Sequence, residues 1–241
     1  MTNGVPLALV RQCFGDRALV PTGVGRALAA SCQWHPLRRL RLVERVCPLY
    51  IGPMRGDVER VLISQDRIAL RVHELARQIT EDHRRVVAGG GDAELTIVPI
   101  LTGAMIFCAD LIRHIPMAMK IGLMAVTSYP GRSVRTQGSR VIGEMLGDLR
   151  GRHVLLVDDI LDSGGTVRLV AGMLKESGAA GVRTCVLLRK DRPSAREVAV
   201  DYVGFEIPDE FVVGYGLDFN NYYRNLPDIV TLKRDVIERT A

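Results

Sequence analysis

Three carboxylates and a turn of small residues stand together directly after the apolar run 154–157. The members that could touch a ligand are Asp158, Asp159, Asp162, Ser163, Gly164, Gly165 and Thr166. Adjacent carboxylates suit ribose hydroxyls and hydrated magnesium, because hard cations prefer oxygen ligands. A Ser-Gly-Gly-Thr turn at the start of a helix directs backbone N–H groups toward one point, where the helix dipole favours a phosphate. The segment therefore predicts a site for a sugar phosphate and a metal ion.

Apolar strands that end in Asp-Asp also occur in ATPases and in receiver domains, so the pair of acids alone does not identify the site. An ATPase requires a Gly-x-x-x-x-Gly-Lys-Ser/Thr loop. No Gly-Lys dipeptide occurs in this chain. The whole string 154–166 is also far more specific than its two adjacent acids, which favours the sugar-phosphate interpretation.

The elements that must position this string follow from the pattern of apolar residues. The predicted strands are residues 95–101, 121–126, 153–157, 182–188 and 202–207. The predicted helices are a long one after Ser64, with Ile68, Val72, Leu75 and Ile79 at helical spacing, then about 104–114 and 166–177. Apolar strands alternating with helices predict an α/β fold whose parallel sheet is covered on both faces. Ligands of such sheets bind at the carboxyl ends of the strands.

The string 154–166 resembles the motif with which type I phosphoribosyltransferases bind 5-phosphoribosyl-1-pyrophosphate (PRPP). Lys190, the block 205–218 and the Asn-Asn-Tyr-Tyr-Arg-Asn-Leu segment 220–226 are similar to hypoxanthine-guanine phosphoribosyltransferases. The likeness spans about residues 58–238. It implies the type I phosphoribosyltransferase fold, a central mostly parallel sheet flanked by helices with a small hood lobe, for a domain at 54–241.

The resemblance implies a PRPP site that includes a second loop, at 101–103. In the family this loop binds pyrophosphate, often carries Lys or Arg at the position of Thr102, and contains a cis peptide, here expected at Leu101-Thr102. The implied PRPP-binding residues are Asp158, Asp159, Asp162, Ser163, Gly164, Gly165, Thr166, Leu101, Thr102, Gly103 and Arg224. Asp158 and Asp159 would lie by the ribose hydroxyls and the metal, and Arg224 by the pyrophosphate.

The resemblance also implies a purine site made by Lys190, Phe211, Val212 and Asp218. Lys190 would donate to the purine O6, Phe211 would stack on the ring and the Val212 backbone would read its edge. Asp162 would be the catalytic residue that holds the N7 proton. The implied magnesium ligands are Asp158, Asp159 and Asp218, and the implied mobile loop begins at Ser128 and Tyr129.

The activity implied is purine salvage: PRPP and hypoxanthine, or guanine, give IMP, or GMP, and pyrophosphate with Mg²⁺. Two alternatives stay open. One is a PRPP-sensing regulator on the same fold, which usually carries an added nucleic-acid-binding element. The other is an enzyme for another base; Lys190 and Phe211 argue against uracil but only weakly against xanthine. The sequence does not rank hypoxanthine, guanine and xanthine.

Charge and composition exclude other classes of protein. Residues 1–53 hold seven arginines against Asp16 and Glu44, so the formal charge of +5 on the 241-residue chain lies entirely there. The main domain is therefore not expected to bind nucleic acid. No apolar run is long enough to span a membrane, and no signal peptide is visible. We expect a cytoplasmic protein, and the family likeness implies a homodimer or homotetramer.

The first 53 residues have no counterpart in the resemblance. We expect an extension that is weakly structured or results from a mis-assigned start, with Met54 as the true start; an intact mass matching 241 residues would exclude that start. An arginine-rich segment that is poor in acidic residues also resembles an organelle transit peptide. A zinc site of Cys13, Cys32, His35 and Cys47 is disfavoured, because the spacing fits no common zinc motif.

Overall fold

The computed structural model describes residue 54 and residues 56–90, 94–127 and 140–240. The described residues all belong to one compact unit, Cys47–Ala241. Residues 1–53 lie outside them, and with them the extension, the alternative start and the disfavoured zinc ligands, which stay predictions. None of the helices in the described segments is long and apolar enough to cross a membrane.

A seven-stranded sheet forms the centre, in the order β5-β4-β2-β6-β7-β8 with β3 also paired to β2. Its strands are β2 (Leu95–Leu101), β3 (Met119–Ile121), β4 (Leu123–Thr127), β5 (Arg140–Met145), β6 (His153–Leu161), β7 (Gly181–Lys190) and β8 (Tyr202–Ile207). All neighbouring pairs are parallel except β4 with β5 at the edge. The predicted mostly parallel α/β sheet is thereby confirmed.

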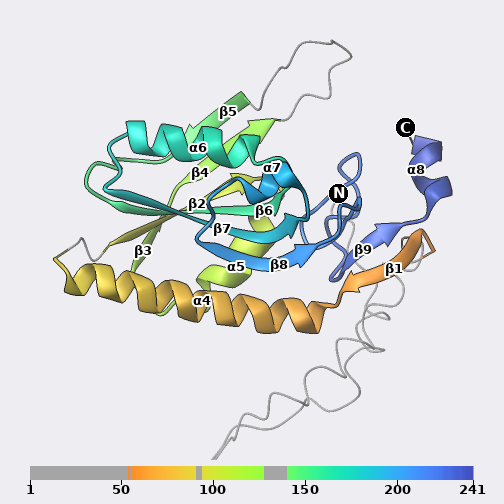
Figure 1. Ribbon diagram of the computed structural model, residues 1–241, viewed down its shortest axis with the longest axis horizontal. Coiled ribbons are helices and arrows are strands. Elements are labelled where there is room, and N and C mark those ends of the chain that lie inside the picture. Colours follow the sequence, from red (N-terminus) through yellow and green to blue (C-terminus); the bar gives the residue numbers. More distant parts are fainter. Residues whose placement is uncertain (1–53, 55, 91–93, 128–139, 241) are drawn as a thin grey trace, which may run out of the picture. The chain divides into compact units, whose positions relative to one another are not determined.

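Alternate residues of β6 enter two separate cores. Leu155 and Val157 pack into the core beneath α4 (Gln65–Ala88) and α5 (Met105–Ile112), whereas Val154 and Leu156 pack into the core beneath α6 (Gly165–Glu176). Figure 1 shows α4 and α5 on one face of the sheet and α6 on the other. A strand that is buried on both faces must be apolar at every position, which explains its continuous apolar run.

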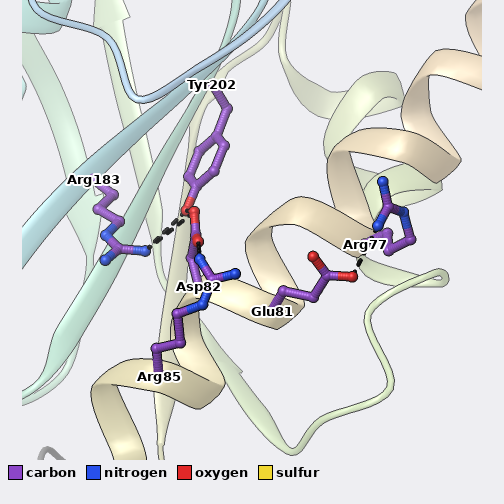
Figure 2. Close-up of polar contacts among 6 residues, drawn as sticks. All are labelled: Arg77, Glu81, Asp82, Arg85, Arg183 and Tyr202. Atoms are coloured by element: carbon purple, nitrogen blue, oxygen red, sulfur yellow. Dashed lines mark hydrogen bonds and ion pairs between the residues drawn. The ribbon is translucent and has the colours of Figure 1, made fainter. Parts of the chain in front are cut away.

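Helix α4 is held to the far strands of the sheet by polar contacts as well as by its buried apolar stripe. Arg71 donates to the carbonyl oxygens of Val203 and Gly204, at 2.8 and 2.9 Å. Near the helix end, the Tyr202 hydroxyl donates to Asp82 at 2.9 Å and accepts from Arg183 at 2.9 Å (Figure 2). These contacts fix the helix across β7 and β8, the strands that end at or lead to the base-side residues.

A second, two-stranded sheet pairs β1 (Val58–Ile63) antiparallel with β9 (Ile229–Leu232), and α8 (Arg234–Thr240) follows. Its own small core contains Val213, Leu226, Val230, Leu232 and Val236. This unit corresponds to the expected small hood lobe. The two strands lie at opposite ends of the domain sequence, so their pairing closes the domain.

Several elements differ from the predictions. The strand expected at 121–126 is interrupted at Gly122 and becomes β3 and β4. Strands β1, β5 and β9 and helices α7 (Pro193–Arg196) and α8 were not predicted. Half of β1 and most of β5 face solvent, so no continuous apolar run marks them. Strand β9 is buried but only four residues long, and both helices are short. Strand β6 extends to Leu161, which places Asp158 and Asp159 within the strand itself.

Candidate active site

The predicted site residues meet at the carboxyl edge of the central sheet. Strand β2 ends at Leu101, β6 carries Asp158 and Asp159, and β7 ends at Lys190. Because these strands are parallel neighbours, their ends lie side by side. The peptide bond between Leu101 and Thr102 is cis, as the family resemblance led us to expect.

Asp158 and Asp159 form a pair of carboxylates with few internal partners. Asp158 is 5% exposed, and its Oδ1 accepts the N–H of Asp159 at 3.1 Å. Oδ1 of Asp159 accepts the N–H of Ile160 at 2.9 Å. Burial raises the pKa of both carboxyls, and the charge of Asp159 raises the pKa of Asp158 further. The arrangement holds two like charges in a place that favours a cation or a hydroxyl donor.

Gly103 packs directly against this pair. A Cβ at position 103 would lie 1.9 Å from Oδ2 of Asp159. On its other side, a Cβ at Gly216, where φ is +104°, would lie 2.2 Å from the carbonyl oxygen of Gly103. Only glycine permits both approaches. The loop after β2 is therefore clamped between the end of β6 and the turn at 214–217.

A glycine turn opens α6 directly after β6, as the sequence predicted. Gly164 is left-handed, with φ at +75°, and a Cβ there would lie 2.2 Å from a methyl group of Val198. Ser163 and Gly165 are exposed, and the Ser163 carbonyl accepts the Arg168 guanidinium at 3.0 Å. The N-cap residue is Gly164 itself, so no side chain caps the helix. The first N–H groups of a helix lack intrahelical partners, so this turn can accept an anion.

Lys190 lies between two carboxylates. Its Nζ is 3.5 Å from Oδ2 of Asp162 and 3.5 Å from Oδ1 of Asp209. Arg192 pairs with the other oxygen of each of these aspartates. Lys190 is buried, with 8% of its surface exposed, whereas the other three are partly open to solvent. The charges of the four residues balance.

The remaining base-side and pyrophosphate-side residues follow β8. Phe211 is 46% exposed and packs edge-on against Phe219, and Val212 beside it is buried. Asp218 receives the Arg224 guanidinium at 2.8 Å on one oxygen and the N–H of Asn221 at 2.8 Å on the other. Arg224 also donates to the Gly216 carbonyl at 2.7 Å. Arg224 is thereby fixed to the same turn that packs on Gly103.

Comparisons with known proteins agree with this geometry. The phosphoribosyl transferase domain matches residues 62–220. A hypoxanthine-guanine phosphoribosyltransferase of Mycobacterium avium is 40% identical over 185 residues, which are 76% of this chain and 90% of that protein. The chain belongs to the phosphoribosyltransferase family.

Solved structures lead to the same family. A hypoxanthine phosphoribosyltransferase of Staphylococcus aureus superposes with a TM-score of 0.68 at 35% identity and covers 76% of this chain and 96% of its own. A Trypanosoma cruzi hypoxanthine phosphoribosyltransferase variant, solved with its product IMP, superposes with a TM-score of 0.67 at 32% identity, covering 76% and 94%. The type I phosphoribosyltransferase fold is thus shown for this chain.

Phosphoribosyltransferases of this kind are expected to use magnesium, and one part of the predicted ligand set fits it. Asp158 is buried and Asp159 partly buried, and within the described segments neither carboxylate forms an ion pair. Asp218 differs, because both of its oxygens already accept internal donors. Among the described residues no group of three or more acidic, His or Cys side chains is arranged to hold a metal. The pair on β6 therefore fits a metal best.

Two residues of this phosphoribosyltransferase were missed by sequence reasoning, Arg192 and Asp209. Both lie just beyond a strand end, two residues after β7 and β8 respectively. That position at the carboxyl edge was a usable signal. Ser128 and Tyr129, predicted to begin the mobile loop, lie outside the described residues.

Proposed function

We propose that this phosphoribosyltransferase transfers the 5-phosphoribosyl group of PRPP to hypoxanthine or guanine, giving IMP or GMP and pyrophosphate, in purine salvage. One observation carries the proposal. The carboxylates Asp158 and Asp159, the glycine turn before α6 and the buried Lys190 share one edge of the sheet. That edge can hold a sugar phosphate beside a base with a hydrogen-bond acceptor.

The PRPP side is built from Asp158, Asp159, the turn 163–166, the loop 101–103 and Arg224. The exposed turn at the start of α6 accepts the 5-phosphate, and the two carboxylates accept the ribose hydroxyls. The carboxylate pair would also hold magnesium, which when bound offsets negative charge on the leaving pyrophosphate. Arg224 and the backbone at Gly103 face that leaving group.

The base side selects a 6-oxopurine through Lys190. Its ammonium group can donate to O6 of hypoxanthine, guanine or xanthine, whereas adenine presents an amine at this position. A site built around a hydrogen bond can reject a partner that lacks it by roughly 10⁴-fold. Phe211 is exposed enough to stack on the purine ring, and the backbone of Val212 beside it can read the ring edge.

In the reaction, N9 of the base attacks C1 of the ribose as the bond from C1 to the pyrophosphate oxygen breaks. The ribose passes through an oxocarbenium-like state, and pyrophosphate leaves with the bonding electrons. Asp162 accepts the proton that N7 loses as N9 becomes bonded. Water must be kept out meanwhile, because it would hydrolyse PRPP.

A turnover assay tests the proposal: the full chain with PRPP, Mg²⁺ and a panel of hypoxanthine, guanine, xanthine, adenine and uracil. We expect IMP and GMP to form and adenine and uracil to be left unchanged. PRPP binding without turnover of any base would favour the regulator instead. Turnover of xanthine alone would change the assigned base but leave the proposed phosphoribosyl transfer in place. Light scattering on the same sample checks the expected homodimer or homotetramer.

A further inference from the structure

We propose that Arg192 and Asp209 are positioning residues for the base: Arg192 aims the carboxylate of Asp162, and Asp209 holds Lys190 in place. This inference rests on the proposed function, in which Asp162 and Lys190 contact the purine. Arg192 and Asp209 act through those two side chains.

The four side chains close into a ring of alternating charge. Oδ1 of Asp162 pairs with Nη1 of Arg192, and Oδ2 lies 3.5 Å from Lys190. Oδ2 of Asp209 pairs with Nε of Arg192, and Oδ1 lies 3.5 Å from Lys190. Every carboxylate oxygen thus faces one cation. The Arg192 contacts are the shorter ones, so the guanidinium sets the rotation of both carboxylates.

The four members differ in how much solvent reaches them. The Lys190 side chain is only 10% exposed, whereas those of Arg192, Asp162 and Asp209 are 38%, 48% and 42% exposed. An ammonium group with so little water needs carboxylates near it. The buried Lys190 ammonium group therefore needs the carboxylates of the ring, whereas the other three side chains can also be solvated by water.

Binding of a base should open one side of this ring. Asp162 would give an oxygen to the N7 proton, and Lys190 would turn toward O6. Lys190 would then lose part of its contact with Asp162 and keep Asp209 as its neutralising partner. Arg192 can stay on Oδ1 of Asp162 and on Asp209 throughout. The Arg192–Asp209 pair is the fixed half, against which the two base-contacting side chains are held.

The closed ring would also be compatible with an inhibitory role for Arg192. If Arg192 mainly blocked the base site, its removal would free Asp162 and Lys190 and would tighten purine binding. The two roles predict opposite changes in KM for the purine, so one measurement separates them.

The experiment compares Arg192→Ala and Arg192→Lys with the wild-type chain, varying hypoxanthine at saturating PRPP and Mg²⁺. Loss of positioning should raise the hypoxanthine KM and lower kcat, each about tenfold, since misplacing a reacting group can cost up to about 10²-fold. PRPP affinity by calorimetry should stay within about twofold. Lysine should recover part of the loss, because it keeps the charge but cannot bridge both carboxylates.

Arg196→Ala is the matched control. Arg196 is an exposed arginine four residues away whose guanidinium pairs with Asp191. It touches Arg192 only through its backbone N–H, which alanine keeps. Its removal should leave all constants unchanged. Asp209→Asn should raise the purine KM more than it lowers kcat, because it removes the charge beside Lys190 while Arg192 keeps its contact with Asp162.

An unchanged or lowered purine KM in Arg192→Ala would overturn the inference. So would an equal loss of PRPP and purine binding, which would mean general damage to the fold. If the wild-type chain converts no 6-oxopurine, the proposed function fails and this inference with it. If the wild-type enzyme is active and the Arg192→Ala variant is unaffected, this inference is wrong and the proposed function stands.

Discussion

The carboxylate of Asp159 fills the space in which a side chain on Gly103 would begin. A Cβ at position 103 would lie 1.9 Å from its Oδ2. The loop after β2 and the end of β6 are therefore in direct contact, although Gly103 and Asp159 lie 56 positions apart in the sequence. Any change in one must move the other, which makes this contact a sensitive test of the site.

Gly103→Ala should lower kcat/KM for PRPP by about 10²-fold or more, because the added methyl must displace either Asp159 or the loop. The protein should still fold, since the contact lies at the sheet edge. Steady-state kinetics and circular dichroism measure the two effects.

Gly172→Ala is the control for that substitution. No atom lies within 4 Å of a Cβ at Gly172, which is inside α6. Alanine there should leave activity unchanged and raise stability by up to about 1 kcal/mol. Equal activity of the two variants would contradict the assigned role of the Gly103 contact.

Asp162→Asn should reduce turnover by about 10²- to 10⁴-fold, because asparagine cannot accept the N7 proton. PRPP affinity should change little, since the turn that holds the 5-phosphate is untouched. Rapid-quench kinetics with calorimetry separates chemistry from binding. Unchanged turnover would refute the role of Asp162 as the base.

Lys190→Ala should weaken purine binding by about 10- to 100-fold, the range for losing a buried charged hydrogen bond of about 1.5–3 kcal/mol. PRPP binding should be nearly intact. Equilibrium binding of hypoxanthine to the PRPP–Mg²⁺ complex gives the comparison. A parallel loss of PRPP affinity would show that Lys190 supports the whole site rather than the base.

Asp158→Asn should stabilise the free enzyme at neutral pH while removing activity. Burial raises the pKa of Asp158 in the folded protein above its ordinary 3.8. The folded state therefore favours the protonated acid, and stability falls as pH rises from about 3.8 through the raised value. Asparagine removes this loss, and the melting temperature at pH 7.5 with EDTA should rise by about 2–4 °C for each kcal/mol relieved.

Asp148→Asn is the comparison in which the stability of the folded protein should depend on pH in the opposite direction. Arg150 lowers the pKa of exposed Asp148 to about 2, so its contribution is present at neutral pH and is lost on acidification. This variant should not become more stable at pH 7.5. A lower melting temperature for Asp158→Asn at that pH would show that its charge is compensated in the free enzyme.

Thr102→Lys should lower the KM for PRPP by up to about fivefold, since an exposed charge interaction is worth up to about 1 kcal/mol. Thr102 is exposed, so a longer side chain can be accommodated. The gain should shrink as salt concentration rises, because salt screens exposed charges. A KM that does not respond at low salt would mean that the loop acts through its backbone alone.

The sequence alone determined those parts of the protein whose structure depends on residues that are neighbours in the chain. The string 154–166 specified a buried strand, its carboxylates and a glycine turn before a helix, because each follows from neighbouring residues. The apolar runs specified the parallel strands for the same reason. Edge strands such as β5, in which residues 142–145 are exposed, carried no such signal.

Only the tertiary structure decided which distant side chains touch. The clamp of Gly103 between Asp159 and Gly216, and the ring of Asp162, Lys190, Asp209 and Arg192, join segments from four strand ends. Such contacts depend on strand order and register, which are set by packing of the whole core rather than by local sequence. Most of these residues could therefore be named in advance, whereas Arg192, Asp209 and the pairing of all of them could not.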